Sequence, residues 1–211
     1  MPLRHGMTLG ELAMMFNVEA HIGARLKVVP LQGYDPGSWY DETGLDWINP
    51  SPNLRSVAEA ALYPGVGMVE GADLSVGRGT SRPFEVLGAP WIDGGELARY
   101  LDRRGIPGVQ FVAAEFMPAT DRYAGRLCHG VRITVTDRDR LDAGEFGLEL
   151  TAALFRLYPQ HFRLVAVTSM VGSRRAVTAI AAGADPRHVA RTWTPDIDAF
   201  RVIRARYLLY R

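Results

Sequence analysis

Helical and extended patterns follow one another along this chain without the strict β-α-β-α alternation typical of a parallel sheet. Apolar residues recur at helical spacing in 94–104, 146–157 and 173–182, whereas 131–135 alternates apolar and polar residues as a half-buried strand does. Further strands are expected at 25–31, 66–69, 83–87 and 109–117, and further helices at 9–16, 54–62 and 197–208. We therefore predict an α+β, or irregular α/β, fold with a mixed sheet and flanking helices.

Composition narrows the class of protein further. With 211 residues, 47% of them hydrophobic and a formal net charge of +1, the chain fits one large domain or two small ones. It has no concentrated Lys/Arg block that would indicate a nucleic-acid partner. No apolar run reaches the roughly 20 residues of a membrane span, and the N-terminus has no secretory signal, so the sequence leaves localisation unknown.

Metal and cofactor chemistry is not indicated. Cys128 is the only cysteine, so neither an intrachain disulfide nor a Cys-based metal site can form, and we expect a packed thiol. His129 adjoins it, but neighbouring residues on a strand point to opposite faces, which argues against a Cys-His nucleophile. The histidines lack the paired spacing of metal ligands, so we expect no metal and no cofactor.

The segment 70–85 combines carboxylates, hydroxyls, arginines and glycines between two apolar runs. Glycines at 71, 77 and 79 permit positive φ or a close approach of the main chain to a ligand. The guanidinium of Arg78 suits a carboxylate, a phosphate or sugar hydroxyls. No lysine follows Gly77-Arg-Gly-Thr80, so a phosphate-binding P-loop is excluded. A solvated turn explains this composition equally well.

The segment 32–53 has no sustained helix or strand period. Its aromatic residues Trp39, Tyr40 and Trp47 suit two roles, either as platforms for sugar rings or as anchors of the loop on the core.

Four ordered motifs together resemble one family: Arg4-His-Gly-Met-Thr-Leu-Gly-Glu-Leu-Ala13, Trp47-Ile-Asn-Pro-Ser-Pro-Asn53, Glu70 to Phe84 followed by Gly88-Ala-Pro-Trp91, and Arg206-Tyr-Leu-Leu-Tyr210. The combination resembles the exo-β-N-acetylmuramidases of the NamZ type. These glycoside hydrolases release N-acetylmuramic acid from the non-reducing end of peptidoglycan fragments. The resemblance covers essentially the whole chain and implies a peptidoglycan-derived sugar as partner, a role in cell-wall recycling and the periplasmic or secreted location common in the family.

Family members carry a Rossmann-like domain ahead of the Arg-His-Gly-Met segment, and their proposed catalytic glutamate lies there in a Pro-Glu-His-Gly motif that this sequence lacks. The resemblance implies that residues 1–211 are the C-terminal auxiliary domain of a two-domain glycosidase, supplying one wall of the substrate cleft. It implies a separate N-terminal half as partner, and a face left uncovered by that half predicts self-association. Enzymatic activity of the chain alone stays open, because a non-catalytic carbohydrate-binding or partner domain, or an inactive fragment, is the alternative.

The family resemblance also suggests site residues. Glu70 is the candidate catalytic carboxylate, because it follows an expected apolar strand where partial burial favours the protonated acid; a structural salt bridge is its alternative role. Arg78 suits the lactyl carboxylate of muramic acid, or else a bond to Glu70 or Glu85 that rigidifies the loop. The residues expected to bind substrate are Arg4, His5, Asn53, Asp73, Ser75, Arg78, Thr80 and Trp91.

Overall fold

The structure is a computed structural model that describes residues 1–210, and its chain divides into two units. Unit 1 joins residues 1–46 to the C-terminal residues from 192 onward, and unit 2 comprises residues 47–191. None of the described helices is both long and apolar enough to cross a bilayer.

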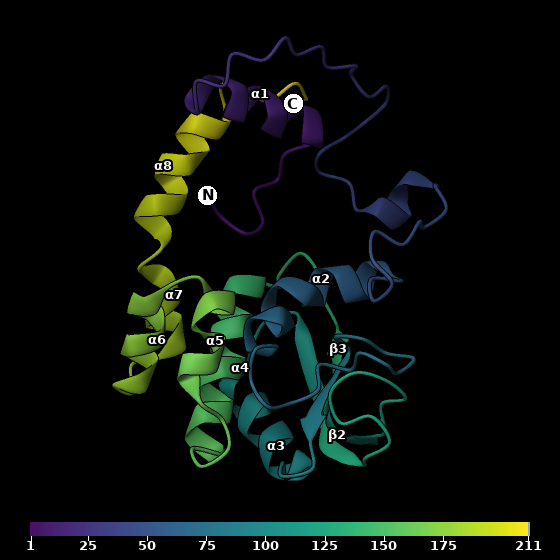
Figure 1. The fold of residues 1–211 in the computed structure, drawn as a ribbon, viewed down its shortest axis with the longest axis vertical. Helices are drawn as coiled ribbons and strands as arrows, with labels where there is room; N and C mark the ends of the chain where they lie inside the picture. The colour runs from purple at the N-terminus through teal and green to yellow at the C-terminus, as the bar shows by residue number, and fades with distance from the viewer. Residues whose placement is uncertain (211) are drawn as a thin grey trace. The chain divides into compact units, whose positions relative to one another are not determined.

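Unit 2 is built on a three-stranded sheet of β1 (Val86–Ala89), β2 (Val109–Phe116) and β3 (Cys128–Val135), in the order β1-β3-β2. One face of the sheet packs against α3 (Gly94–Arg104) and, through the ring contact of Phe111 with Phe146, against α4 (Ala143–Leu157) (Figure 1). The α+β class is confirmed. The sheet differs from the expected mixed sheet, because β3 lies between β1 and β2 and pairs antiparallel with both.

The remaining elements of unit 2 pack against α4 or, in the case of α6, against α5 and α7. They are α2 (Val57–Val66), the 3₁₀ turn η2 (Gly67–Val69), α5 (Leu164–Val171), α6 (Arg174–Ala181) and α7 (Pro186–Arg191). α4 contacts α2, α3, α5, α7 and η2, and most of its side chains are buried. This central helix therefore forms the core on the inner side of the sheet.

Local signals in the sequence set the ends of α3. The side chain of Asp93 accepts a hydrogen bond from Glu96 N at 2.9 Å, and the helix ends at Gly105 in the left-handed region, with φ +57°. The predicted strands at 109–117 and 131–135 are confirmed as β2 and β3, and the strand at 83–87 as β1, shifted toward Ala89.

Two predicted strands are wrong. Residues 66–69 end α2 and form η2, because this short apolar run, with Val66 and Val69 fully buried, packs as helix against α4. A short buried run does not distinguish strand from helix by its periodicity. Residues 25–31 are irregular and have no partner strand among the described residues. No helix was expected at 164–171, where the structure has α5.

Unit 1 contains α1 (Leu9–Glu19), the 3₁₀ turn η1 (Tyr40–Thr43) and α8 (Thr194–Arg204). Thr8 and Glu11 form a capping box at the start of α1, with Thr8 N donating to Glu11 Oε2 at 2.7 Å. Glu11 Oε1 also accepts from Leu209 N at 2.8 Å, which ties the C-terminal segment to α1. Burial opposes ionisation of Glu11, but these hydrogen bonds outweigh it and lower the pKa of the carboxyl.

Candidate functional site

The segment between η2 and β1 forms a loop, residues 70–85. Gly77 and Gly79 lie in the left-handed region, with φ +82° and +76°. A Cβ atom on Gly71 would lie 2.4 Å from the carbonyl oxygen of Ala166 in α5, so this glycine permits a close approach to protein backbone. The expected positive φ is therefore confirmed at Gly77 and Gly79, whereas Gly71 approaches another part of the chain and not a ligand.

Glu70 and Arg78 form an ion pair across this loop. Arg78 Nε donates to Glu70 Oε1, and both side chains are about three-quarters buried, with 26% of Glu70 and 27% of Arg78 exposed. The hydrogen bond to Glu70 raises the pKa of Arg78, so the guanidinium stays charged. The expected strand before Glu70 is instead the turn η2, and the alternative of a salt bridge between the two residues is what the structure shows.

An aromatic layer supports the Glu70–Arg78 pair. The guanidinium of Arg78 lies over the ring of Phe84, 5.1 Å from its centroid, and the Phe84 ring meets Tyr63 edge-on at 5.0 Å. Phe84 is fully buried and has a φ of +61°, which is unfavourable for a bulky residue. Strained backbone of this kind persists where the surrounding structure holds it, and it is concentrated at functional sites.

Asp73 connects the loop to residues 117–127. Its carboxylate accepts a hydrogen bond from Arg122 at 2.8 Å, and its carbonyl oxygen accepts one from the Tyr123 hydroxyl at 3.2 Å. Asp121 and Tyr123 also have positive φ values, of +69° and +63°. Three of the four described non-glycine residues with positive φ therefore belong to these two loops.

The hydroxyls of Ser75 and Thr80 both bind the main chain of Gly77. Ser75 Oγ accepts from Gly77 N at 3.2 Å, while Thr80 Oγ1 donates to Gly77 O at 2.7 Å. Ser75 is buried, with 3% of its surface exposed, and its backbone pairs with Gly88 of β1. Thr80 is half-buried. The Ser75 hydroxyl therefore shapes the loop, and the Thr80 hydroxyl does so from an accessible position.

Trp91 lies at the edge of the same region. Its indole N–H donates to the Tyr123 hydroxyl at 3.2 Å, and its ring stacks on His161 at 5.1 Å with an interplanar angle of 8°. The structure thus connects Trp91 to Asp73 through Tyr123.

The other predicted site residues lie outside this hydrogen-bonded cluster. Asn53 is half-buried in the turn between Ser51 and Leu54, where the indole N–H of Trp47 donates to Leu54 O at 3.1 Å. Trp47 therefore anchors its loop. Arg4 and His5 belong to unit 1, and His5 Nδ1 accepts a hydrogen bond from Met7 N at 3.2 Å.

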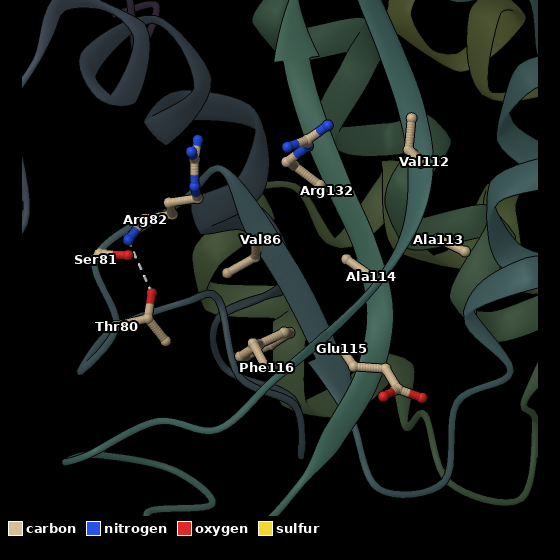
Figure 2. Close-up of a pocket in the computed structure, with 10 residues that line it drawn as sticks. All are labelled: Thr80, Ser81, Arg82, Val86, Val112, Ala113, Ala114, Glu115, Phe116 and Arg132. Atoms are coloured by element: carbon tan, nitrogen blue, oxygen red, sulfur yellow. Dashed lines mark hydrogen bonds between the residues drawn. The ribbon is translucent and has the colours of Figure 1, made fainter.

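A groove of about 480 Å³, which sequence analysis did not predict, lies on the open face of the sheet. Thr80, Ser81 and Arg82 of the loop form one side, and Val86, Val112, Ala114, Phe116 and Arg132 of the strands form the floor and the far side (Figure 2). The only signal for it in the sequence is the alternation of 131–135, which places Arg132 opposite the buried face.

No group of three or more His, Cys, Asp or Glu residues suited to a metal ion occurs within residues 1–210. Cys128 is fully buried, and burial raises the pKa of its thiol, so it is the packed thiol that the sequence indicates. His129 instead faces Glu115, with 3.0 Å between Nδ1 and Oε1.

Comparison with known proteins defines the class. The C-terminal model of the exo-β-N-acetylmuramidase NamZ family matches residues 61–210, and its N-terminal model matches residues 1–58. The chain therefore belongs to the NamZ exo-β-N-acetylmuramidase family. The resemblance of the four sequence motifs to this family is confirmed.

Particular relatives are similar over the whole chain. The peptidoglycan β-N-acetylmuramidase NamZ of Bacillus subtilis strain 168 is 39% identical over 212 residues, which cover 99% of this chain and 51% of that protein. Two crystal structures of DUF1343 family proteins from Bacteroides fragilis align with 100% of the chain, at TM-scores of 0.88 and 0.78 with 27% and 29% identity. They are covered to 58% and 57%, so the chain spans about half the length of the relatives it matches.

Proposed function

We propose that this chain takes part in the hydrolysis of N-acetylmuramic acid from the non-reducing ends of peptidoglycan fragments. In this proposal residues 1–211 act as the C-terminal part of a two-domain glycosidase and supply one wall of its substrate cleft. The observation that carries it is the loop 70–85, which lies within the segment matched by the family's C-terminal model and holds the Glu70–Arg78 pair against Phe84, a residue with strained backbone. The relative from Bacillus subtilis, a peptidoglycan β-N-acetylmuramidase, supports the substrate class.

Glu70 is the carboxylate that we assign to the reaction. Glycosidases commonly place two carboxyl groups roughly 5 to 9.5 Å apart across the scissile bond, one protonated and one ionised. Because Glu70 accepts a hydrogen bond from the guanidinium of Arg78, we assign it the ionised role, in which it would stabilise positive charge that develops on the sugar. The protonated partner would then come from another part of the enzyme.

We assign the remaining substrate contacts from the exposure and the chemical groups of the predicted binding residues. Thr80 and Asp73 offer polar groups at the surface of the loop, and Trp91 offers an aromatic edge beside them. Asn53, with Arg4 and His5 of unit 1, stays in the proposal on the strength of the family motifs. Ser75 contributes by shaping the loop, because its hydroxyl is buried against Gly77.

A non-catalytic carbohydrate-binding or partner domain is the second candidate. It is favoured by the pairing of Glu70 with Arg78, since a structural salt bridge needs no reaction, and by the lack of a Pro-Glu-His-Gly motif in the 211 residues. An inactive fragment is the third candidate, and it predicts neither turnover nor sugar binding.

Hydrolysis of a chromogenic N-acetylmuramic acid β-glycoside tests these candidates. It is measured for the full 211-residue chain alone and for the chain mixed with the N-terminal part of a family member. Glu70→Gln is compared with Glu145→Gln, a matched control in which a carboxylate with 26% of its side chain exposed lies 3.5 Å from Arg187. We expect the Glu70 variant to lose roughly 100-fold or more in turnover and the Glu145 variant to stay near the wild type. Equal turnover of both variants would remove Glu70 from the reaction, while sugar binding without turnover in either arrangement would favour the binding domain.

Self-association belongs to the same proposal. Several large apolar side chains are exposed, among them Leu9 at 86% and Val29 at 78% in unit 1. Where such side chains form one contiguous patch, the patch is typical of an interaction site. Sedimentation velocity over a range of concentrations tests it: we expect association of the chain alone, reduced by the added N-terminal part, and a concentration-independent monomer would contradict it.

A further inference from the structure

The groove on the open face of the sheet carries the charged side chain of Arg132, with an apolar side chain on either side of it. Strand register places Arg132 of β3 directly between Val86 of β1 and Val112 of β2, all three on the same face. The next row along the sheet is Gly88, Gly130 and Ala114, so the floor there is shallow and small. Figure 2 shows the guanidinium groups of Arg82 and Arg132 at one end of the groove and Phe116 toward the other.

Arg132 is the charged group in this groove that is left without a counterion. Within residues 1–210 its guanidinium has neither a hydrogen bond nor an ion pair. Arg82 is paired with Glu85 at 3.0 Å, and Glu115 is paired with His129 at 3.0 Å. The groove therefore presents one uncompensated positive charge, which complements an anion.

The neighbours of Arg132 restrict which anion fits. A planar guanidinium binds a carboxylate through two parallel N–H···O bonds. Val112 is 45% exposed beside it, so a ligand with a methyl group next to its carboxylate gains apolar contact as well. The lactyl ether of muramic acid has this combination, a carboxylate and a methyl group on one carbon.

We propose that Arg132 binds the lactyl carboxylate of N-acetylmuramic acid, with the lactyl methyl group against Val112 and the sugar toward Thr80 and Ser81. This inference rests on the proposed function and names a specificity residue for it. Arg78 is less suited to this task, because a lactyl carboxylate would have to displace Glu70, whereas Arg132 requires no displacement. Thr80 lines both the groove and the loop of Glu70, which makes the two parts of the site continuous.

The test is calorimetric binding of two sugars to the full chain. N-acetylmuramic acid carries the lactyl group, and N-acetylglucosamine is the same sugar without it. We expect the wild type to prefer N-acetylmuramic acid, and Arg132→Gln to weaken its binding about tenfold, as loss of a charge-assisted pair does, with no change for N-acetylglucosamine. Arg175→Gln, which removes an exposed charge from α6 in the same unit, is the matched control and should bind both sugars as the wild type does.

A second variant and a second ligand sharpen the result. Val112→Glu places a carboxylate beside Arg132 and should abolish the preference, while circular dichroism checks that each variant folds. N-acetyl-D-alanyl-D-alanine also carries a methyl group next to a carboxylate, so Arg132-dependent binding of this peptide in preference to the sugar would overturn the lactyl assignment. Unchanged N-acetylmuramic acid binding by a folded Arg132→Gln variant would overturn it too. That result would leave turnover of the chromogenic substrate intact and so would not affect the proposed function. If the wild type showed no sugar binding and no turnover, the proposed function itself would be wrong.

Discussion

The contact between Gly79 and Thr120 makes the loop 70–85 sensitive to a single methyl group. A Cβ atom on Gly79 would lie 2.3 Å from Thr120 O and 2.8 Å from Thr120 N, so backbone rather than a flexible side chain would have to move. Alanine at a φ of +76° costs roughly 1–2 kcal/mol. Displacing residue 120 also breaks the hydrogen bond from Ala119 N to Gly79 O, 2.8 Å long, at about 1 kcal/mol. We expect Gly79→Ala to lower the free energy of unfolding by about 2–3 kcal/mol in total.

Gly183→Ala separates the two contributions. Gly183 has a similar φ of +85°, but nothing lies within 4 Å of the position of its Cβ, so only the conformational cost of roughly 1–2 kcal/mol applies. Both glycines belong to unit 2, so urea denaturation followed by circular dichroism measures both changes in the same transition. Equal destabilisation by the two substitutions would refute the reasoning, because it would show that the Thr120 backbone does not restrict the loop.

Two further predictions concern buried carboxylates. The pKa of Glu11 lies below its ordinary value of 4.5, so the stability that its carboxylate contributes is present above that pH and is lost as pH falls through the lower folded-state pKa. Glu11→Gln should therefore lower the free energy of unfolding by about 2 kcal/mol at pH 7. A stability difference between this variant and the wild type that persists undiminished in acid would contradict this. Glu149 is 1% exposed and accepts two hydrogen bonds of 2.8 Å from Arg104, so Glu149→Ala should cost about 3 kcal/mol by urea denaturation. Arg104 keeps its pair with Asp185, and a loss below about 1 kcal/mol would show that this partner compensates.

The elements with strong local signals could be predicted from the sequence. α1 and α3 each begin at a residue whose side chain caps the helix, and the alternation of β3 follows from one buried and one open face. Residues 25–31 carry an extended pattern, but the pattern does not supply a partner strand, and extended backbone becomes a strand only by pairing. The strand prediction at residues 66–69 was wrong for a different reason, because burial on all sides removes the periodicity that distinguishes a helix from a strand.

The candidate site also has a part that could be predicted from the sequence and a part that could not. The glycine conformations and the Glu70–Arg78 bond are local to one loop, and the sequence indicated both, the bond as one of two alternatives. The groove depends on strand register, which brings Val86, Arg132 and Val112 into one row from three separate segments. Residue types alone do not fix that register, so the position of Arg132 emerged only from the fold.

Unit 1 joins residues 1–46 to residues from 192 onward, so it cannot be completed before those later residues are synthesised. Glu11 accepts its hydrogen bond from Leu209, and the hydroxyl of Tyr210 accepts one from Leu31 N at 2.8 Å. The whole of unit 2 leaves the ribosome before the residues from 192 onward that these bonds require. Contacts between distant residues also form slowly, because a long loop must close first. We therefore expect α1 to remain without these partners until residues 192–210 are synthesised, which leaves its apolar side chains accessible to chaperones after the residues of unit 2 have already been made.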